Sequence, residues 1–161
     1  MEGYGLSDFV ERKNPSLRAI RRWAAKGGDG NLQFRLGCAY LFGHPLRRSY
    51  RKARRWFALA AENGHLRAQA NLGQMYFHGD GVLKSGKKAL RILMEPAMAG
   101  IPEAQFTIGC LYLNGMGVKR SYKDAYEWFD KARLGGFVGV EDLMESVRKL
   151  IDLEKGSKDS N

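Results

Sequence analysis

The sequence contains little of what catalytic, secreted or membrane-spanning proteins need. Its 161 residues include two cysteines, four prolines and three histidines. No stretch reaches the roughly eighteen consecutive apolar residues that indicate a membrane-spanning helix. The N-terminal segment, MEGYGLSDFVERKN, contains acidic side chains and no apolar run, unlike a secretory signal. We therefore expect a cytoplasmic protein without a membrane span.

Motifs for chemistry are also missing. His44, His65 and His78 share no metal-ligand spacing with one another, with cysteine or with paired carboxylates. The sequence has no phosphate-binding P-loop, no nucleophile elbow and no CxxC pair. We therefore expect no enzymatic activity, no bound metal and no cofactor.

What the sequence does contain is a repeat with a period of thirty-six residues. Two columns of glycine, one of tyrosine and one of alanine keep this period over three cycles: Gly37, Gly73 and Gly109; Gly64, Gly100 and Gly136; Tyr40, Tyr76 and Tyr112; Ala53, Ala89 and Ala125. Such a period is typical of a stacked helical solenoid, in which each repeat packs mainly on its neighbours. A solenoid offers a long surface for binding.

Each repeat predicts two helices, A and B. In the second repeat, Ala68, Leu72, Met75 and Tyr76 have the spacing of one buried helix face, which predicts helix A. A serine before each helix B predicts an N-cap, and a glycine after it predicts a left-handed C-terminal cap. The glycine inside each helix A costs about 1 kcal/mol relative to alanine. It therefore predicts close packing against a large aromatic side chain of helix B.

These motifs resemble the Sel-1-like repeat (SLR) family, relatives of the tetratricopeptide repeats. The matching segments are LGCAY, LGQMYFHGDGV, IGCLYLNGMGV, ARRWFALAAENG and AYEWFDKARLGG, within residues 17–137. The resemblance implies a right-handed α/α superhelix whose A helices line the concave face. It also implies a non-enzymatic scaffold or adaptor in protein complexes.

We therefore predict an all-α fold, a right-handed superhelix of three SLR repeats between two capping helices. The single domain spans 1–161 and divides into an N-terminal cap with a partial repeat, three repeats, a C-terminal capping helix and a disordered tail: 1–30; 31–66, 67–102 and 103–138; 139–154; 155–161. Within the cap, Pro15 to Ala25 reads as the second helix of a degenerate repeat.

Two prolines depart from the repeat pattern. Pro45 cannot adopt the positive φ that is open to Gly81 and Gly117 at the matching positions, so its loop should differ from the other two. Pro96 lies within the expected helix B of the second repeat, where it removes a backbone donor. It predicts a kink or an early end of that helix near Glu95.

The two cysteines, Cys38 and Cys110, occupy the same repeat position two cycles apart. Packed helices lie about 10 Å apart, so two layers exceed the ~7 Å limit between the Cα atoms of a disulfide. We interpret both cysteines as small buried apolar residues. A redox pair is the alternative.

Positive charge is concentrated near the N-terminus. Residues 1–55 contain thirteen Lys or Arg against four Asp or Glu, whereas residues 56–161 contain fourteen against thirteen. This asymmetry favours an acidic or anionic partner. Candidate residues for such a partner lie at the basic end and along an outer ladder beside the start of each helix B: Arg18, Arg22, Arg48, Arg51, Lys52, Arg54, Arg55, Lys84, Lys87, Arg120 and Lys123. A merely solvated basic face is the alternative.

Polar residues of helix A beside its buried stripe form a second candidate set, suited to hydrogen bonding an extended peptide: Gln33, Arg35, Gln69, Asn71, Gln74, Gln105 and Thr107. A structural role for the glutamines is the alternative. We predict a monomeric protein-interaction module, an adaptor, scaffold or inhibitor, that binds a partner through the concave face. The alternative is a polyanion binder that uses the outer ladder to bind nucleic acid or an anionic membrane surface.

Overall fold

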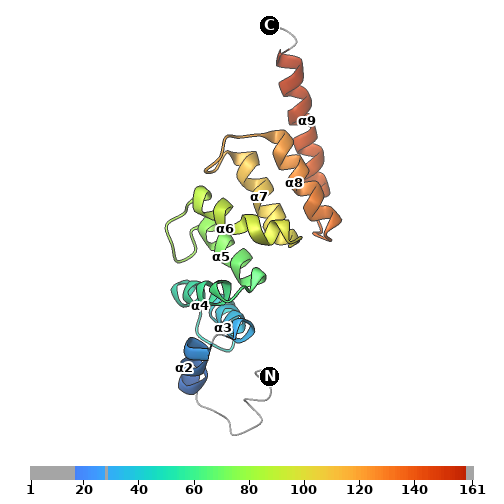
Figure 1. The fold of residues 1–161 in the computed structure, drawn as a ribbon. Coiled ribbons are helices and arrows are strands. Elements are labelled where there is room, and N and C mark those ends of the chain that lie inside the picture. The colour runs from blue at the N-terminus through green and yellow to red at the C-terminus, as the bar shows by residue number, and fades with distance from the viewer. Residues whose placement is uncertain (1–16, 28, 159–161) are drawn as a thin grey trace. The chain divides into compact units, whose positions relative to one another are not determined.

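The chain is helical throughout the part that the structure describes. The computed structural model describes residues 17–27 and 29–158, which contain eight α-helices and no strand: α2 (Leu17–Gly27), α3 (Gly30–Phe42), α4 (Tyr50–Glu62), α5 (Leu66–His78), α6 (Gly86–Met98), α7 (Pro102–Asn114), α8 (Tyr122–Leu134) and α9 (Glu141–Lys158) (Figure 1). The prediction of an all-α fold is confirmed.

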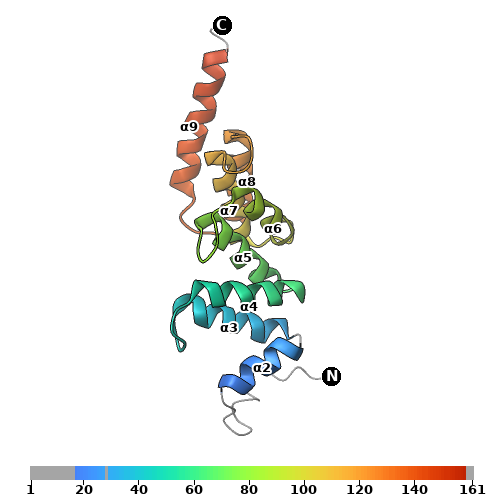
Figure 2. The same cartoon turned by 90° about the vertical axis from the view of Figure 1, so that its left-hand side faces the viewer.

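The chain divides into two compact units, residues 1–68 and 69–161, with the boundary inside α5. In unit 1, α3 packs against α4 (Figure 2), and α2 packs against α3. Ala24 of α2 is fully buried, as is Ala60 at the matching position of α4. Within the described residues, α2 therefore behaves as the helix B of a partial repeat, as predicted, whereas Pro15 lies outside them.

In unit 2, α6 packs against α7, α7 against α8, and α8 against α9. The core of α6 and α7 contains Leu93, Ile108 and Leu111. A second cluster joins Phe129 of α8 to the start of α9 through Val140, Met144 and Val147.

The three predicted serine caps are confirmed. Each serine hydroxyl accepts a hydrogen bond from the third backbone N–H after it, at 3.4, 3.3 and 3.2 Å: Ser49 from Lys52, Ser85 from Lys88 and Ser121 from Asp124. The glycines that follow helix B have φ of 75°, 86° and 92° at Gly64, Gly100 and Gly136, which confirms the left-handed turns.

The glycine within helix A is required by close packing, as predicted. A Cβ atom added to Gly37 would lie 2.5 Å from the ring of Phe57, and one added to Gly109 would lie 2.5 Å from the ring of Phe129. At Gly73 the neighbour is Leu93, also at 2.5 Å. The aromatic partner is therefore confirmed in the first and third repeats, and leucine replaces it in the second.

Pro96 does not end helix B early, so that part of the prediction is wrong, while the kink stays a prediction. Helix α6 continues to Met98 and has thirteen residues, the same length as α4 and α8. The missing N–H of Pro96 leaves the carbonyl of Ile92, four residues earlier, without its helical donor. The side chain of Gln69 replaces that donor, because its Nε2 lies 3.1 Å from Ile92 O.

Two further differences concern Pro45 and the C-terminus. The loop with Pro45 differs from its counterparts as expected, because the His44–Pro45 peptide is cis while Gly81 and Gly117 have φ of 67° and 76°.

The disorder predicted from Lys155 is wrong for residues 155–158, because α9 continues to Lys158. Residues 159–161 lie outside the described part of the chain.

Candidate partner-binding surfaces

The helix A glutamines are used inside the protein. Gln33 is only 1% exposed, and its Nε2 donates to Ala24 O at 2.8 Å, near the end of α2. Its Oε1 accepts from Nδ2 of Asn63 at 2.9 Å. Carbonyls in the last turn of a helix lack an intrahelical donor, so Gln33 links α3 to the end of α2 and to α4. It has no amide group left for a partner.

The third repeat uses its glutamine in the same way. Gln105 is 8% exposed, and its Nε2 donates to Ala97 O at 2.9 Å, in the last turn of α6. Its Oε1 is buried and has no partner among the described residues, because glycine occupies position 135, which matches Asn63. The hydroxyl of Thr107 is also engaged, donating to Glu103 O at 2.7 Å. The structural alternative therefore holds for Gln33, Gln105 and Thr107, and we remove them from the candidate site.

Gln69 is half-buried, and its Nε2 donates both to Ile92 O and, at 2.9 Å, to the carboxylate of Glu95. Of the other helix A candidates, Arg35 is exposed, whereas Asn71 and Gln74 are half-buried. Arg35 belongs to unit 1, and Asn71 and Gln74 belong to unit 2. Of the seven helix A candidates, Arg35 is therefore the one whose side chain is exposed rather than buried or half-buried.

The basic candidates are far more accessible. Ten of the eleven are exposed: Arg18, Arg22, Arg48, Arg51, Lys52, Arg55, Lys84, Lys87, Arg120 and Lys123. The exception is Arg54, which is half-buried and whose Nε is buried without a hydrogen-bond acceptor among the described residues. The structure brings seven of the candidates together in unit 1 and leaves four in unit 2.

The described part of unit 1 has little negative charge to balance these cations. Its described residues include twelve Lys or Arg but only two carboxylates, Asp29 and Glu62. The Asp29 carboxylate caps α3, accepting from the backbone of Asn31 at 2.9 Å and Leu32 at 3.3 Å. None of the eleven cations between residues 17 and 55 forms a salt bridge with a described carboxylate.

Aromatic rings support several of the cations. Arg21 of α2 and Lys52 of α4 both lie 5.3 Å from the ring centroid of Tyr40, a residue of α3. In the ladder, Arg48 lies 5.7 Å from the Tyr50 ring, and two further pairs lie at 5.3 and 5.9 Å: Arg120 with Tyr122, and Lys84 with Phe77. These contacts position the side chains while most of the charged groups stay exposed.

We call the exposed cations of α4 and the preceding loop, with Arg22 of α2, the basic patch: Arg22, Arg47, Arg48, Arg51, Lys52 and Arg55. Arg47 was not predicted to belong to this patch, and Arg21 was not predicted to contact the Tyr40 ring. The sequence could have indicated Arg47, because it directly precedes the ladder residue Arg48 in a basic run. The sequence could not have indicated the Arg21 contact, since only the packing of α2 on α3 brings its guanidinium to Tyr40.

The two thiols are not activated. Burial raises the pKa of the Cys38 thiol above its ordinary value and raises the pKa of Cys110 to about 11, which disfavours reactive thiolates. Both cysteines are free. Among the described residues, no group of three or more His, Cys, Asp or Glu is placed to hold a metal ion, and no helix is long and apolar enough to cross a membrane.

His65 has a structural role at the start of α5. Its Nδ1 accepts from the backbone N–H of Ala68 at 3.1 Å, and its ring stacks on Phe34 at 4.4 Å between centroids. Burial lowers the pKa of His65, and a backbone hydrogen bond partly opposes this effect. The matching residue of the third repeat, Phe137, stacks on Phe106 at 4.3 Å.

Known proteins include one family pattern and several solved structures that are similar to this chain. The family pattern described as "Sel1 repeat" matches residues 31–65, 66–93 and 102–137. A Sel1 repeat protein from Oxalobacter formigenes is similar in structure, with 36% identity and a TM-score of 0.66, over 81% of this chain and 97% of the other. No curated protein sequence matches the chain.

Two further structures are similar. A protective antigen of uropathogenic Escherichia coli, which displays an SLR fold, has 32% identity and a TM-score of 0.67, over 76% of this chain and 26% of the antigen. Helicobacter pylori cysteine rich protein B has 21% identity and a TM-score of 0.56, over 83% of this chain and 94% of the other, and at that identity indicates the fold alone.

Proposed function

Because this chain belongs to the Sel1 repeat family, we propose that it is a non-enzymatic protein-binding module whose basic patch in unit 1 binds an acidic partner. Proteins of this family are generally protein-interaction modules and are not typically enzymes. The observation that carries the more specific proposal is the lack of salt bridges to described carboxylates for all eleven cations between residues 17 and 55.

Electrostatics support an acidic partner in particular. Like charges close together on one unit repel one another, and no described ion pair in that segment relieves the repulsion. A partner with complementary charge removes this cost on binding and also accelerates the encounter. Arg and Tyr are enriched where protein surfaces bind tightly, and the patch has the arginines Arg51 and Arg55 one helical turn apart on α4.

The proposed binding surface is the basic patch of unit 1 in place of the predicted concave helix A face. Two of the four glutamines of the predicted concave site, Gln33 and Gln105, are buried, whereas the residues of the basic patch are exposed. Four helix A candidates stay as proposed contributors: Arg35 in unit 1 and, in unit 2, Gln69, Asn71 and Gln74. The cytoplasmic location and the monomeric state stay predictions.

The test is affinity capture from nuclease-treated extract of the source cell, comparing three forms of the protein. The test variant carries Arg51→Glu and Arg55→Glu, and the control carries Lys119→Glu and Arg148→Glu, which make the same change in net charge with exposed residues of unit 2. The wild-type protein and the control should capture the same acidic protein, and the test variant should lose most of it. With the purified partner, the dissociation constant should rise about tenfold or more in the test variant.

A salt titration separates the proposed function from polyanion binding. Nucleic acid binding weakens steeply with salt because each phosphate contact releases counterions. Binding of an acidic protein to the exposed patch should also weaken between about 0.1 and 0.3 M salt, because the charges are screened. Its slope should be shallower than that of nucleic acid, since no condensed phosphate counterions are released. If only nucleic acid is captured when nuclease is omitted, or if the test variant captures the same protein as fully as the control does, the proposal is wrong.

A further inference from the structure

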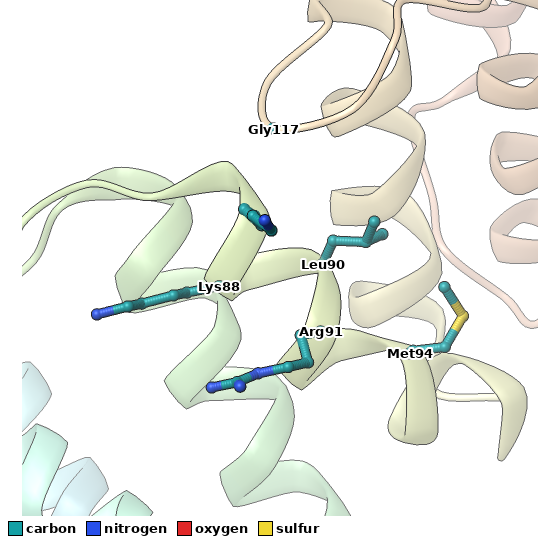
Figure 3. A pocket seen from close by; sticks show the side chains of 6 residues that line it. Lys88, Leu90, Arg91, Met94 and Gly117 are labelled. Atoms are coloured by element: carbon teal, nitrogen blue, oxygen red, sulfur yellow. The ribbon is translucent and has the colours of Figure 1, made fainter.

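A groove lies on the surface of unit 2, where the loop between α7 and α8 passes close to α6 (Figure 3). Its volume is about 670 Å³, within the range of ligand-binding clefts. It is lined by Lys87, Lys88, Leu90, Arg91, Met94 and Gly117. All six residues belong to unit 2.

Two glycines create the groove. A Cβ atom added to Gly86, the first residue of α6, would collide with the backbone oxygen of Met116, and one added to Gly117 would collide with the backbone of Lys87. The loop therefore lies directly on the first turn of α6. At the position of Gly86, the first and third repeats have Tyr50 and Tyr122. Glycine at this position therefore lets the loop after α7 approach the start of α6 more closely than a tyrosine would allow.

The inner wall of the groove is apolar. Leu90 and Met94 are half-buried and pack against the core of α6 and α7. Figure 3 shows both side chains on the side of α6 that faces the Gly117 loop, away from Lys88 and Arg91. Met98 follows one turn later and is 72% exposed, so the apolar stripe continues beyond the groove.

This wall is particular to the second repeat. The matching positions of the first repeat hold Arg54 and Ala58, and those of the third hold Tyr126 and Asp130. The repeat pattern therefore does not require large aliphatic side chains here. Methionine is flexible and polarisable, which suits contact with side chains of varied shape.

Three cations also line the groove. Lys87, Lys88 and Arg91 are exposed, and none forms a salt bridge with a described carboxylate. Figure 3 shows Lys88 and Arg91 extending in the same direction from α6. The nearest carboxylate along that helix, Glu95, accepts instead from Gln69 at 2.9 Å.

We propose that this groove binds an extended acidic segment of a partner protein, with apolar side chains on Leu90 and Met94 and carboxylates beside Lys87, Lys88 and Arg91. Charge complementarity identifies the occupant: the apolar wall fixes side chains, and the neighbouring cations, which have no described salt bridge, favour negative charge next to those side chains. The wall has only two large apolar residues in an open groove, which suits side chains of a peptide better than the acyl chains of a lipid. The inference goes beyond the proposed function, because this groove and the basic patch belong to different units.

The test uses a fluorescein-labelled peptide of about ten residues that alternates glutamate with leucine, since side chains of an extended segment alternate in direction. Binding to the full chain is measured by fluorescence anisotropy. The test variants take their residues from the other repeats: Met94→Ala, as at Ala58, and Arg91→Glu, as at Glu127. The dissociation constant should rise about fivefold with Met94→Ala and about tenfold with Arg91→Glu.

Three controls make the result specific. Arg148→Glu alters an exposed cation of α9 and should change the dissociation constant less than about twofold. A peptide with serine in place of leucine should bind at least about fivefold more weakly. Vesicles of phosphatidylglycerol should not compete with the labelled peptide.

The proposal is overturned by equal binding of the two peptides, by unchanged affinity in both test variants with an intact circular dichroism spectrum, or by vesicles that displace the peptide. The Arg51→Glu, Arg55→Glu protein serves as a further comparison. Loss of peptide binding in that protein, with normal binding in the Met94 and Arg91 variants, places the peptide on the basic patch. This result refutes the groove and leaves the proposed function standing.

Discussion

The two units are built from the same repeat but treat charge differently. The described part of unit 1 has twelve Lys or Arg against two Asp or Glu, whereas unit 2 has thirteen against eleven. Both ion pairs formed between described residues within 4 Å lie in unit 2: Arg133–Asp130 at 2.7 Å and Lys149–Glu145 at 3.7 Å. Exposed pairs contribute about 0–1 kcal/mol, so the fold does not depend on them. The repeat sets which positions are buried and leaves outward positions free to suit a partner.

The two units can also be compared at equivalent positions of the repeat, which lie thirty-six or seventy-two residues apart in the sequence. Three exchanges matter here, from unit 1 to unit 2: Phe57 to Leu93, Asn63 to Gly135 and His65 to Phe137. Each of these exchanges predicts a different response to mutation.

The largest effect is expected for Gly37→Ala. The new methyl group would lie 2.5 Å from the Phe57 ring, which is fully buried and rigid. Overpacking of this kind costs up to about 3 kcal/mol, against which alanine gains about 1 kcal/mol in helix propensity. Gly73→Ala should cost less, because it meets the flexible Leu93 at the same distance. Urea unfolding measures both. Adding Phe57→Leu to Gly37→Ala should recover part of the loss, and equal losses at the two glycines would contradict this account.

A smaller effect is expected for Asn63→Ala. The substitution removes the donor to the buried Oε1 of Gln33, a bond of 2.9 Å. Because Asn63 itself is exposed, the cost should lie at the low end for an unsatisfied acceptor, about 1 kcal/mol. Gln105 already lacks this donor among the described residues. Gln33→Leu alone serves as the background control, because it removes the Asn63 acceptor together with the donor to Ala24 O. Asn63→Ala should cost less in the Gln33→Leu background than in the wild-type protein. If thermal melting shows the same cost in both backgrounds, the Asn63–Gln33 hydrogen bond does not stabilise unit 1.

The smallest effect is the pH dependence contributed by His65. Because its pKa is lowered in the folded protein, the unfolded chain binds the proton more readily. This contribution to stability is therefore complete above the ordinary pKa of 6.5 and decreases as the pH falls below that value. Protonation also removes the Nδ1 acceptor that caps α5.

Replacing His65 by phenylalanine, as at Phe137, provides the comparison. The free energy of unfolding of the wild-type protein should fall more between about pH 7.5 and 5.5 than that of His65→Phe. Both proteins keep the same carboxylates, so the difference isolates the imidazole. Parallel pH profiles would show that His65 does not contribute.

Much of the local structure could be predicted from the sequence. Serine caps, positive-φ glycines and the glycine packed on helix B follow from backbone geometry, which each repeat must satisfy with the same residue at the same place. Ser49, Gly64 and Gly37 were therefore recognisable from their counterparts. The open basic patch was also largely predictable, because exposure of Arg51 and Arg55 follows from the helical period.

The role of the glutamines could not be predicted in the same way. A repeated glutamine fits a partner-binding column as well as an internal hydrogen bond, and only its neighbours decide. Gln33 and Gln105 bond carbonyls of a preceding helix, while Gln69 bonds Ile92 O, the carbonyl that Pro96 leaves without a donor. The same contact explains why Pro96 does not shorten α6.

The sequence by itself determined the helical repeat, its caps and its unequal charge, because these depend on residue spacing along one chain. Only the tertiary structure decided which polar groups remain available and where Gly86 and Gly117 bring a loop onto a helix. The physical reason is that hydrogen bonds and close contacts between helices depend on distances across the fold, which spacing along the chain does not specify.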